Sequence, residues 1–156
     1  MNIRKFLGGH PESRRIYFFF LIAIAVFVID HILKIFAFQQ KCFVFCFNAV
    51  INKGAAFSLL SGLSWGRILF IIVAVVVLVS VVFAYFRFSR NSVLLRWALT
   101  LIFGGTLSNL LDRIVWGYVV DYIPFFNFSG LTFNLADLAN SIGVLLLIVF
   151  LLKKKN

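Results

Sequence analysis

The stretch GGTLSNLLDR, from Gly104 to Arg113, combines the two signals on which the interpretation rests. It closes a long apolar run that begins near Ser92 and predicts a membrane-spanning helix. An asparagine, an aspartate and an arginine then fall within the last five residues. A charged group at membrane depth costs several kcal/mol unless it is paired or hydrated, so such residues indicate a functional site.

The composition of the whole chain is that of an integral membrane protein. Of its 156 residues 63% are hydrophobic, whereas soluble domains are usually about 45–50% apolar. The formal net charge of +10 comes from lysines and arginines that flank the apolar stretches, as charges that orient membrane spans do. Binding to nucleic acid is therefore not expected.

Four apolar stretches are long enough to cross a bilayer, because a core of about 30 Å needs about 20 helical residues. They cover about residues 16–36, 67–85, 94–111 and 135–152. We expect a membrane all-α fold, a four-helix bundle in one domain over residues 1–156. Two arginines precede the first span, as in a signal peptide, but its apolar run is long and no A-x-A site follows, so it is expected to be retained.

Lysines and arginines predict the orientation of the spans. They cluster before the first span, between the second and third spans, and at the C-terminus, three regions that share one side of the membrane. Positive residues favour the cytoplasmic side, so both termini are expected there. The same topology brings four aspartates to the outer side: Asp30, Asp112, Asp121 and Asp137.

The two outer connections differ from ordinary loops. The first, about residues 37–66, contains KCFVFCFN, whose aromatic and β-branched residues predict a strand and a small sheet or cradle on the membrane surface. The second, about residues 113–133, is rich in aromatic side chains, which predicts an interfacial belt or the wall and lid of a substrate groove. Its aromatic residues are Trp116, Tyr118, Tyr122, Phe125, Phe126, Phe128 and Phe133.

Two cysteines, Cys42 and Cys46, are too few for a disulfide framework or a four-ligand zinc site. Two free thiols are favoured, although a turn between them would permit a bridge. The aspartates lack the imidazole or thiolate partners typical of zinc, so no metal is expected.

Asp112 and Asp137 lie at the outer ends of two consecutive antiparallel spans, so their carboxyl groups are expected to be neighbours. Two carboxylates at one partly dry site cannot easily both ionise, and they share a proton. In an aspartic protease one takes a proton from water and the other donates to the peptide carbonyl. From spacing alone, a catalytic pair, passage of ions or protons, and plain helix pairing all remain open.

Other polar residues have a structural explanation beside a functional one. Asp30 and Lys34 are spaced i,i+4 and can form a local ion pair on the first span. Asn52 and Gly54 fit a tight turn as well as a functional contact.

Arg113 can pair with Asp121 or Asp112, or extend to lipid phosphates. The neighbouring residues Gly104 and Gly105 predict close contact between helices, because small residues let membrane helices approach each other.

Several motifs, taken in their order along the chain, closely resemble those of the lipoprotein signal peptidase family, also called signal peptidase II. DHILK (30–34) resembles D-x-x-x-K, and NKGAAFS (52–58) resembles N-x-G-x-A-F. The stretch GGTLSNLLDRIVWGYVVDYI (104–123) resembles G-G-x-x-x-N-x-x-D-R followed by V-x-D-[FY]-I. FNLADLANSIG (133–143) is similar to F-N-x-A-D followed by a spaced glycine. Five elements in order along nearly the whole chain are very specific.

The resemblance implies an intramembrane aspartic endopeptidase of the bacterial inner membrane, with its active site toward the outer face. It would remove signal peptides from diacylglyceryl-modified prolipoproteins, just before the lipid-bearing cysteine, with Asp112 and Asp137 as the catalytic pair. No cofactor is implied; the expected partners are prolipoproteins, membrane lipids and inhibitors such as globomycin, and a monomer is expected. The implied active-site shell is Asn52, Gly54, Asn109, Arg113, Asn134 and Ala136, with Asp30, Lys34 and Asp121 as further motif positions.

Two residues depart from the family pattern: His31 stands where glutamine is frequent, and Asn140 where an apolar residue is more usual. The alternative function is a small carboxylate-based transporter or proton-conducting protein, which predicts aspartates at mid-depth along a path to both faces. Every aspartate here is expected near one face, which favours the peptidase. A structural assembly subunit would leave the Asn–Asp motifs without a purpose.

Overall fold

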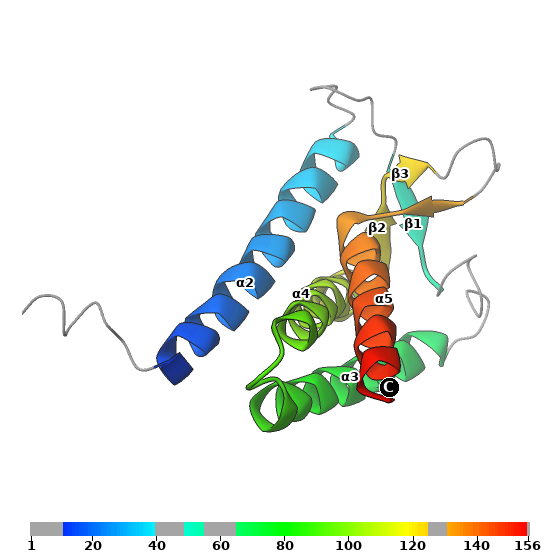
Figure 1. Cartoon of the computed structure of the whole chain (residues 1–156). Coiled ribbons are helices and arrows are strands. Elements are labelled where there is room, and N and C mark those ends of the chain that lie inside the picture. The colour runs from blue at the N-terminus through cyan, green and yellow to red at the C-terminus, as the bar shows by residue number, and fades with distance from the viewer. Residues whose placement is uncertain (1–10, 40–48, 55–64, 125–130, 156) are drawn as a thin grey trace, which may run out of the picture.

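The computed structural model describes residues 11–39, 49–54, 65–124 and 131–155. Its long helices are α2, α3, α4 and α5 (Figure 1). All four are long and apolar enough to cross a membrane, which confirms the predicted membrane all-α fold. They run further than the apolar stretches because polar turns at their ends are helical too. Their bounds are Pro11–Phe38, Gly66–Phe88, Val93–Val115 and Leu135–Lys155.

Helix α4 is the centre of the arrangement and packs against α2, α3 and α5 (Figure 1). Buried residues make up 56% of its most apolar stretch, compared with 11–17% in the other three helices. Those three helices turn many large apolar side chains outward, as helices in contact with lipid do. The inner face of α4 therefore supplies both the packing surface and much of the polar site.

An apolar core fills the end of the protein where α2 begins and α3 ends. At this end the Tyr85 hydroxyl donates to the main-chain oxygen of Arg15 at 2.6 Å, which ties α3 to α2. The side chains of this core are apolar, so their packing adds to that hydrogen bond. Its buried members are Phe19, Val81, Tyr85, Leu95, Leu99 and Ile102.

Two adjacent glycines let α4 approach two neighbours at once. A Cβ atom on Gly104 would lie 3.0 Å from the main-chain oxygen of Ala23 on α2. A Cβ atom on Gly105 would lie 2.8 Å from Asn140 Oδ1 on α5. The close helix contact predicted for both glycines is confirmed. Asn140, the unusual polar residue, accepts a hydrogen bond from Thr106 at 3.2 Å and thus joins α5 to α4.

The C-terminal end of α4 is closed by Gly117 and Arg67. Gly117 has a φ of 82°, a left-handed conformation that ends helices, and its N–H donates to Asp112 O at 3.2 Å. The Arg67 guanidinium donates to the oxygens of Arg113 and Ile114 at 2.8 and 3.0 Å. These bonds satisfy the last carbonyl groups of the helix and fix the exit of the chain toward the strands.

Two small antiparallel sheets lie at the end where α2 stops and α5 starts (Figure 1). Strand β1 (Val50–Asn52) pairs with β2 (Val119–Asp121), and β3 (Ile123–Pro124) pairs with β4 (Thr132–Phe133). The predicted small sheet is confirmed. The KCFVFCFN stretch (41–48), with both cysteines, lies outside the described residues.

The aromatic connection is exposed only in part. Trp116 is 44% exposed, as expected at a membrane interface, but Tyr122 is fully buried. The interfacial interpretation is therefore wrong for Tyr122, because its hydroxyl binds polar groups inside the site. Phe125, Phe126 and Phe128 lie outside the described residues, so the lid remains a prediction.

The glycine contact predicts the effect of Gly105→Ala. The added methyl group would meet the main-chain oxygen of Ala136 and the Asn140 side chain, and overpacking costs about 1–3 kcal/mol, more than the gain of about 1 kcal/mol in helix propensity. We expect a lower melting temperature in detergent. The control is Val76→Leu, which likewise adds one carbon, but on the exposed face of α3. It should change the melting temperature little. Equal melting temperatures for both variants would contradict the packing argument.

Candidate active site

Lys34 is the centre of the site, 2% exposed near the end of α2. Its ammonium donates to Asp30 Oδ2 at 2.5 Å, to Asp112 Oδ2 at 2.6 Å and to Asn109 Oδ1 at 3.1 Å. An ammonium group has three donors, so each of them has an acceptor. The predicted Asp30–Lys34 pair is confirmed, and the same ammonium also joins α2 to α4.

Asp30 is a fully occupied carboxylate. Its Oδ2 atom accepts from Lys34 and from Ser108 Oγ at 2.7 Å. Its Oδ1 atom accepts from Tyr122 Oη at 3.0 Å and from the main-chain N–H of Ala136 at 3.2 Å. A carboxylate has about four lone-pair sites, so Asp30 has none left for a reaction. It connects α2 to α4, to the outer connection and to the start of α5.

Asp112 is buried as deeply as Asp30 but accepts far fewer hydrogen bonds. Its Oδ2 atom binds Lys34, whereas its Oδ1 atom makes no aligned hydrogen bond within the described part of the chain. Oδ1 faces His31 Nε2 at 3.3 Å, a distance that suits an ion pair. Asp112 thus has lone pairs available for a proton, a water molecule or a substrate.

Asp137 and Asn134 cap the start of α5 reciprocally. The Asp137 N–H donates to Asn134 Oδ1 at 2.9 Å, and the Asn134 N–H donates to Asp137 Oδ2 at 3.2 Å. This arrangement resembles a capping box, and a carboxylate in the first turn also interacts favourably with the helix dipole. The Leu135 N–H donates to Tyr122 Oη at 3.0 Å. Asp137 is half-buried, so water can reach it.

Asn109 joins the two proposed catalytic carboxylates. Its Nδ2 atom donates to Asp137 Oδ1 at 2.7 Å. Its Oδ1 atom accepts from Lys34 at 3.1 Å and from Asn134 Nδ2 at 3.2 Å. Because Lys34 also binds Asp112, the two aspartates are linked through one ammonium and one amide. The structure places both aspartates in one network, separated by these two side chains.

Asp121 on β2 is 2% exposed and forms the outer edge of the network. It accepts from Asn134 Nδ2 at 2.8 Å and from Asn52 Nδ2 at 2.9 Å. Burial raises the pKa of Asp121 to about 6, although the hydrogen bonds from both amides act in the opposite direction. Asp121 thus positions two asparagines and titrates near neutral pH.

The Asn52–Gly54 turn and Arg113 close the network. The Gly54 N–H donates to Asn52 Oδ1 at 2.9 Å, which confirms the predicted turn. Arg113 donates to Gly54 O at 3.0 Å and to Asn109 O at 3.1 Å. It also lies 5.3 Å from the ring centre of Phe70, a cation–π contact. Pairing of Arg113 with an aspartate, one of the predicted options, is wrong: it binds main-chain oxygens.

Every site residue predicted from the sequence belongs to this single network, which also contains Ser108, Tyr122 and His31. Ser108 precedes Asp112 by one helical turn on the same buried face of α4, a spacing that would have revealed it. Tyr122 gave no such signal, because an aromatic residue in an aromatic stretch does not show which way it points. Burial raises the pKa of Tyr122, so its hydroxyl stays a donor to Asp30.

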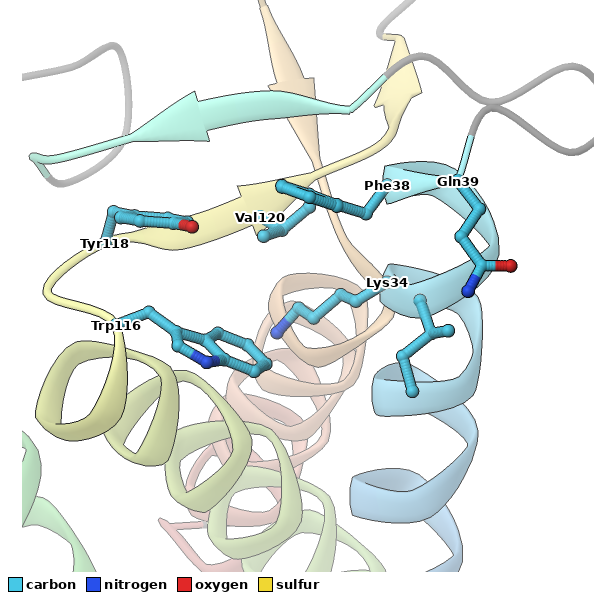
Figure 2. A pocket seen from close by; sticks show the side chains of 7 residues that line it. Lys34, Phe38, Gln39, Trp116, Tyr118 and Val120 are labelled. Atoms are coloured by element: carbon cyan, nitrogen blue, oxygen red, sulfur yellow. The ribbon is translucent and has the colours of Figure 1, made fainter.

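A cavity of about 250 Å³ lies beside Lys34, between the end of α2 and β2. Figure 2 shows the Lys34 side chain reaching into it from α2, with Trp116 and Tyr118 opposite Phe38 and Gln39. Its wall is mainly apolar and aromatic. The lining residues are Lys34, Ile35, Phe38, Gln39, Trp116, Tyr118 and Val120.

Metal coordination has no candidate group in the described ranges, where no three His, Cys, Asp or Glu side chains come together suitably. The positive charge between Asp30 and Asp112 is instead the Lys34 ammonium. The described residues thus form a site of carboxylates, amides and one buried amine.

The four-helix fold of the chain is similar to that of bacterial membrane enzymes whose structures are solved. Two solved structures, both described as a bacterial membrane enzyme structure by the in meso method, at 2.3 and 1.9 Å resolution, are similar to this chain. Their TM-scores are 0.77 and 0.75, at 28% and 29% identity. The matches cover 88% and 86% of this chain and 89% and 92% of theirs.

The family model for signal peptidase (SPase) II matches residues 22–153. Lipoprotein signal peptidases of Halothermothrix orenii and Pseudomonas aeruginosa are 36% and 37% identical over 146 and 148 residues. These alignments cover 88% and 86% of this chain, and 97% and 88% of the two relatives. The chain therefore belongs to the signal peptidase II family, as its motifs predicted.

Asp121 makes folding stability depend on pH. Its pKa of about 6 in the folded protein exceeds the ordinary 3.8, so its contribution is fully present below about pH 4 and is lost as pH rises through about 6. As the pH rises from about 4.5 to about 7.5, the melting temperature of wild type should decrease relative to that of Asp121→Asn. The decrease should be equivalent to about 1–3 kcal/mol of unfolding free energy. A pH-independent difference would contradict the assigned burial.

Proposed function

We propose that this protein is an intramembrane aspartic endopeptidase that removes signal peptides from diacylglyceryl-modified bacterial prolipoproteins, just before the lipid-bearing cysteine. Its membership of the signal peptidase II family supports the reaction class and the prolipoprotein substrate. One observation carries the catalytic assignment: Asp112 and Asp137 are linked through Lys34 and Asn109. The pair lies where α4 ends and α5 begins.

The number of hydrogen bonds that each carboxylate accepts supports this choice of catalytic pair. Asp30 has four donors and no free lone pair, and Asp121 is held by two amides at the edge of the network. Asp112 has one oxygen, Oδ1, that accepts no aligned hydrogen bond from the described residues, and Asp137 is half-buried. These two are therefore best placed to exchange protons with water and substrate.

The proposed reaction uses the pair as base and acid. One carboxylate takes a proton from a water molecule, whose oxygen bonds to the scissile carbonyl carbon, while the other carboxyl group donates its proton to the carbonyl oxygen. The tetrahedral intermediate then collapses. The carbon–nitrogen bond breaks, and the leaving nitrogen takes a proton from the first carboxyl group, while the hydroxyl proton returns to the second. Asn109, Asn134 and Arg113 hold the pair, and Asn52 acts through Asp121.

The substrate's apolar signal helix would arrive laterally from the bilayer, with its diacylglyceryl chains left in the outer leaflet. The cavity beside Lys34 would take an apolar substrate side chain near the scissile bond, because its wall includes Phe38, Trp116 and Val120. This placement explains why an apolar cavity adjoins a buried amine (Figure 2).

The orientation follows from charge. The ends of the helices opposite the site carry Arg14, Arg15, Arg87 and Lys153, and positive residues favour the cytoplasm. Both termini would then be cytoplasmic and the active site would face outward, in the bacterial inner membrane. We further propose one domain over residues 1–156, a monomer surrounded by membrane lipids, and inhibition by globomycin-type compounds.

A proton or ion conductor is the less favoured function. Conduction needs a polar path across the whole membrane, whereas the buried acidic side chains lie at one end and an apolar core fills the other. The one buried threonine in that half, Thr100, donates to its own helix at Arg96 O. The packing therefore supports a site open to one side.

The test is cleavage of a purified, diacylglyceryl-modified prolipoprotein in detergent, followed by gel shift. Asp112→Asn and Asp137→Asn should each lower kcat by about 100-fold or more, because each removes a proton-transfer group. The control is Glu12→Gln, which also replaces a carboxylate by an amide but lies near the opposite end of α2. This variant should cleave the substrate like wild type.

A cooperative melting transition well above the assay temperature in each variant would exclude unfolding as the cause. Substantial activity in a folded Asp112→Asn or Asp137→Asn variant would overturn the catalytic pair. Absence of cleavage by folded wild type would overturn the peptidase function itself.

A further inference from the structure

His31 is the titratable neighbour of Asp112 that the reaction described above does not use. It lies on α2 directly after Asp30, and its side chain is 19% exposed, whereas that of Asp112 is fully buried. The ring stacks on Phe27 with 4.3 Å between ring centres. His31 thus occupies the partly exposed side of a buried carboxylate.

The hydrogen bonds determine which ring nitrogen of His31 carries a proton. Nδ1 lies 3.1 Å from the main-chain oxygen of Phe27, which can only accept. Nδ1 also lies 3.1 Å from Ser108 Oγ, whose own hydrogen is donated to Asp30 at 2.7 Å. Both partners therefore require a proton on Nδ1.

A neutral ring with its proton on Nδ1 has a lone pair on Nε2. That lone pair would face the Asp112 carboxylate at 3.3 Å, where two acceptors repel each other. A proton between Nε2 and Oδ1 removes this repulsion and gives the otherwise unsatisfied Oδ1 atom a partner.

The charge balance supports the same proton. Among the groups that Lys34 contacts, two carboxylates, Asp30 and Asp112, share its single positive charge, which leaves one negative charge beside His31. Uncompensated buried charge is strongly unfavourable. A proton on the His31–Asp112 pair neutralises it.

The charged groups around the His31 ring are few. Asp112 faces it from α4, and Lys34 lies one turn along its own helix α2. Asp30 reaches the ring only through Ser108. Asp137 on α5 binds Asn109 and the main chain of Asn134, and Asp121 on β2 binds side-chain amides instead.

We propose that His31 and Asp112 hold one proton between Nε2 and Oδ1, and that His31 is thereby a titratable positioning residue for Asp112. The catalytic consequence rests on the proposed peptidase function. When the pair loses this proton at higher pH, Asp112 loses its partner at Oδ1 and its orientation. The decline of kcat on the basic side should therefore contain two steps: loss of this proton and loss of the proton on the acidic carboxyl group of the catalytic pair.

The kinetic test compares wild type with His31→Gln and His31→Leu over about pH 5 to 9. A glutamine amide donates to Oδ1 without titrating, so His31→Gln should retain kcat within about threefold at the optimum and show a basic decline displaced from that of wild type. His31→Leu has no donor and should lose about tenfold or more in kcat at every pH, with little change in KM. A basic decline in His31→Gln at the same pH as in wild type would overturn the proposal.

A second measurement does not depend on peptidase activity. Nitrogen-15 NMR of the imidazoles in the full-length protein should show Nδ1 of His31 protonated throughout, and a pH midpoint for Nε2 that moves by about one unit or more in Asp112→Asn. His10, the other histidine, provides the reference signal, and His10→Gln assigns the two. Equal His31 midpoints in wild type and Asp112→Asn would overturn the shared proton, even in a protein that cleaves. A moved midpoint in a protein without cleavage would support the proton and refute only the peptidase.

Discussion

The Lys34 ammonium, buried between carboxylates of two helices, is the interaction on which the rest of the site depends. Taking an ammonium group out of water costs several kcal/mol, which is recovered only when every donor has a good acceptor. Asp30, Asp112 and Asn109 supply the three acceptors. Because these residues belong to α2 and α4, and Asn109 continues to Asp137 on α5, one cation fixes three helices around the proposed catalytic pair.

The structure separates structural from reactive carboxylates by the number of their donors. Asp30 and Asp112 bind the same ammonium, yet Asp30 has four donors, whereas among the described residues only His31 faces the second oxygen of Asp112. Because all of its lone pairs accept hydrogen bonds, Asp30 is held rigidly. Asp112 still has lone pairs available and can exchange a proton. The apolar half of the protein contributes close packing between the helices. The polar residues of the site therefore gather at the other end.

The sequence was sufficient to predict the four helices, the small sheet and most members of the network, because span length and local motifs are properties of short segments. The Asp30–Lys34 pair was visible at a spacing of four residues. The bond from Lys34 to Asp112 joins residues 78 positions apart and needs the packed helices. Tyr122 was misplaced at the interface because composition does not reveal its orientation, and the proton on His31 depends on hydrogen-bond partners that only coordinates identify.

The most direct measurement is a double-mutant cycle between Lys34 and Asp112. Melting temperatures and unfolding free energies would be compared for wild type, Lys34→Met, Asp112→Asn and the double variant in one detergent. Removing one partner of a buried pair costs about 3–5 kcal/mol, so Lys34→Met should destabilise the wild type by at least about 1 kcal/mol more than it destabilises Asp112→Asn. Equal losses in both backgrounds would show that Lys34 does not hold Asp112, and would contradict the account.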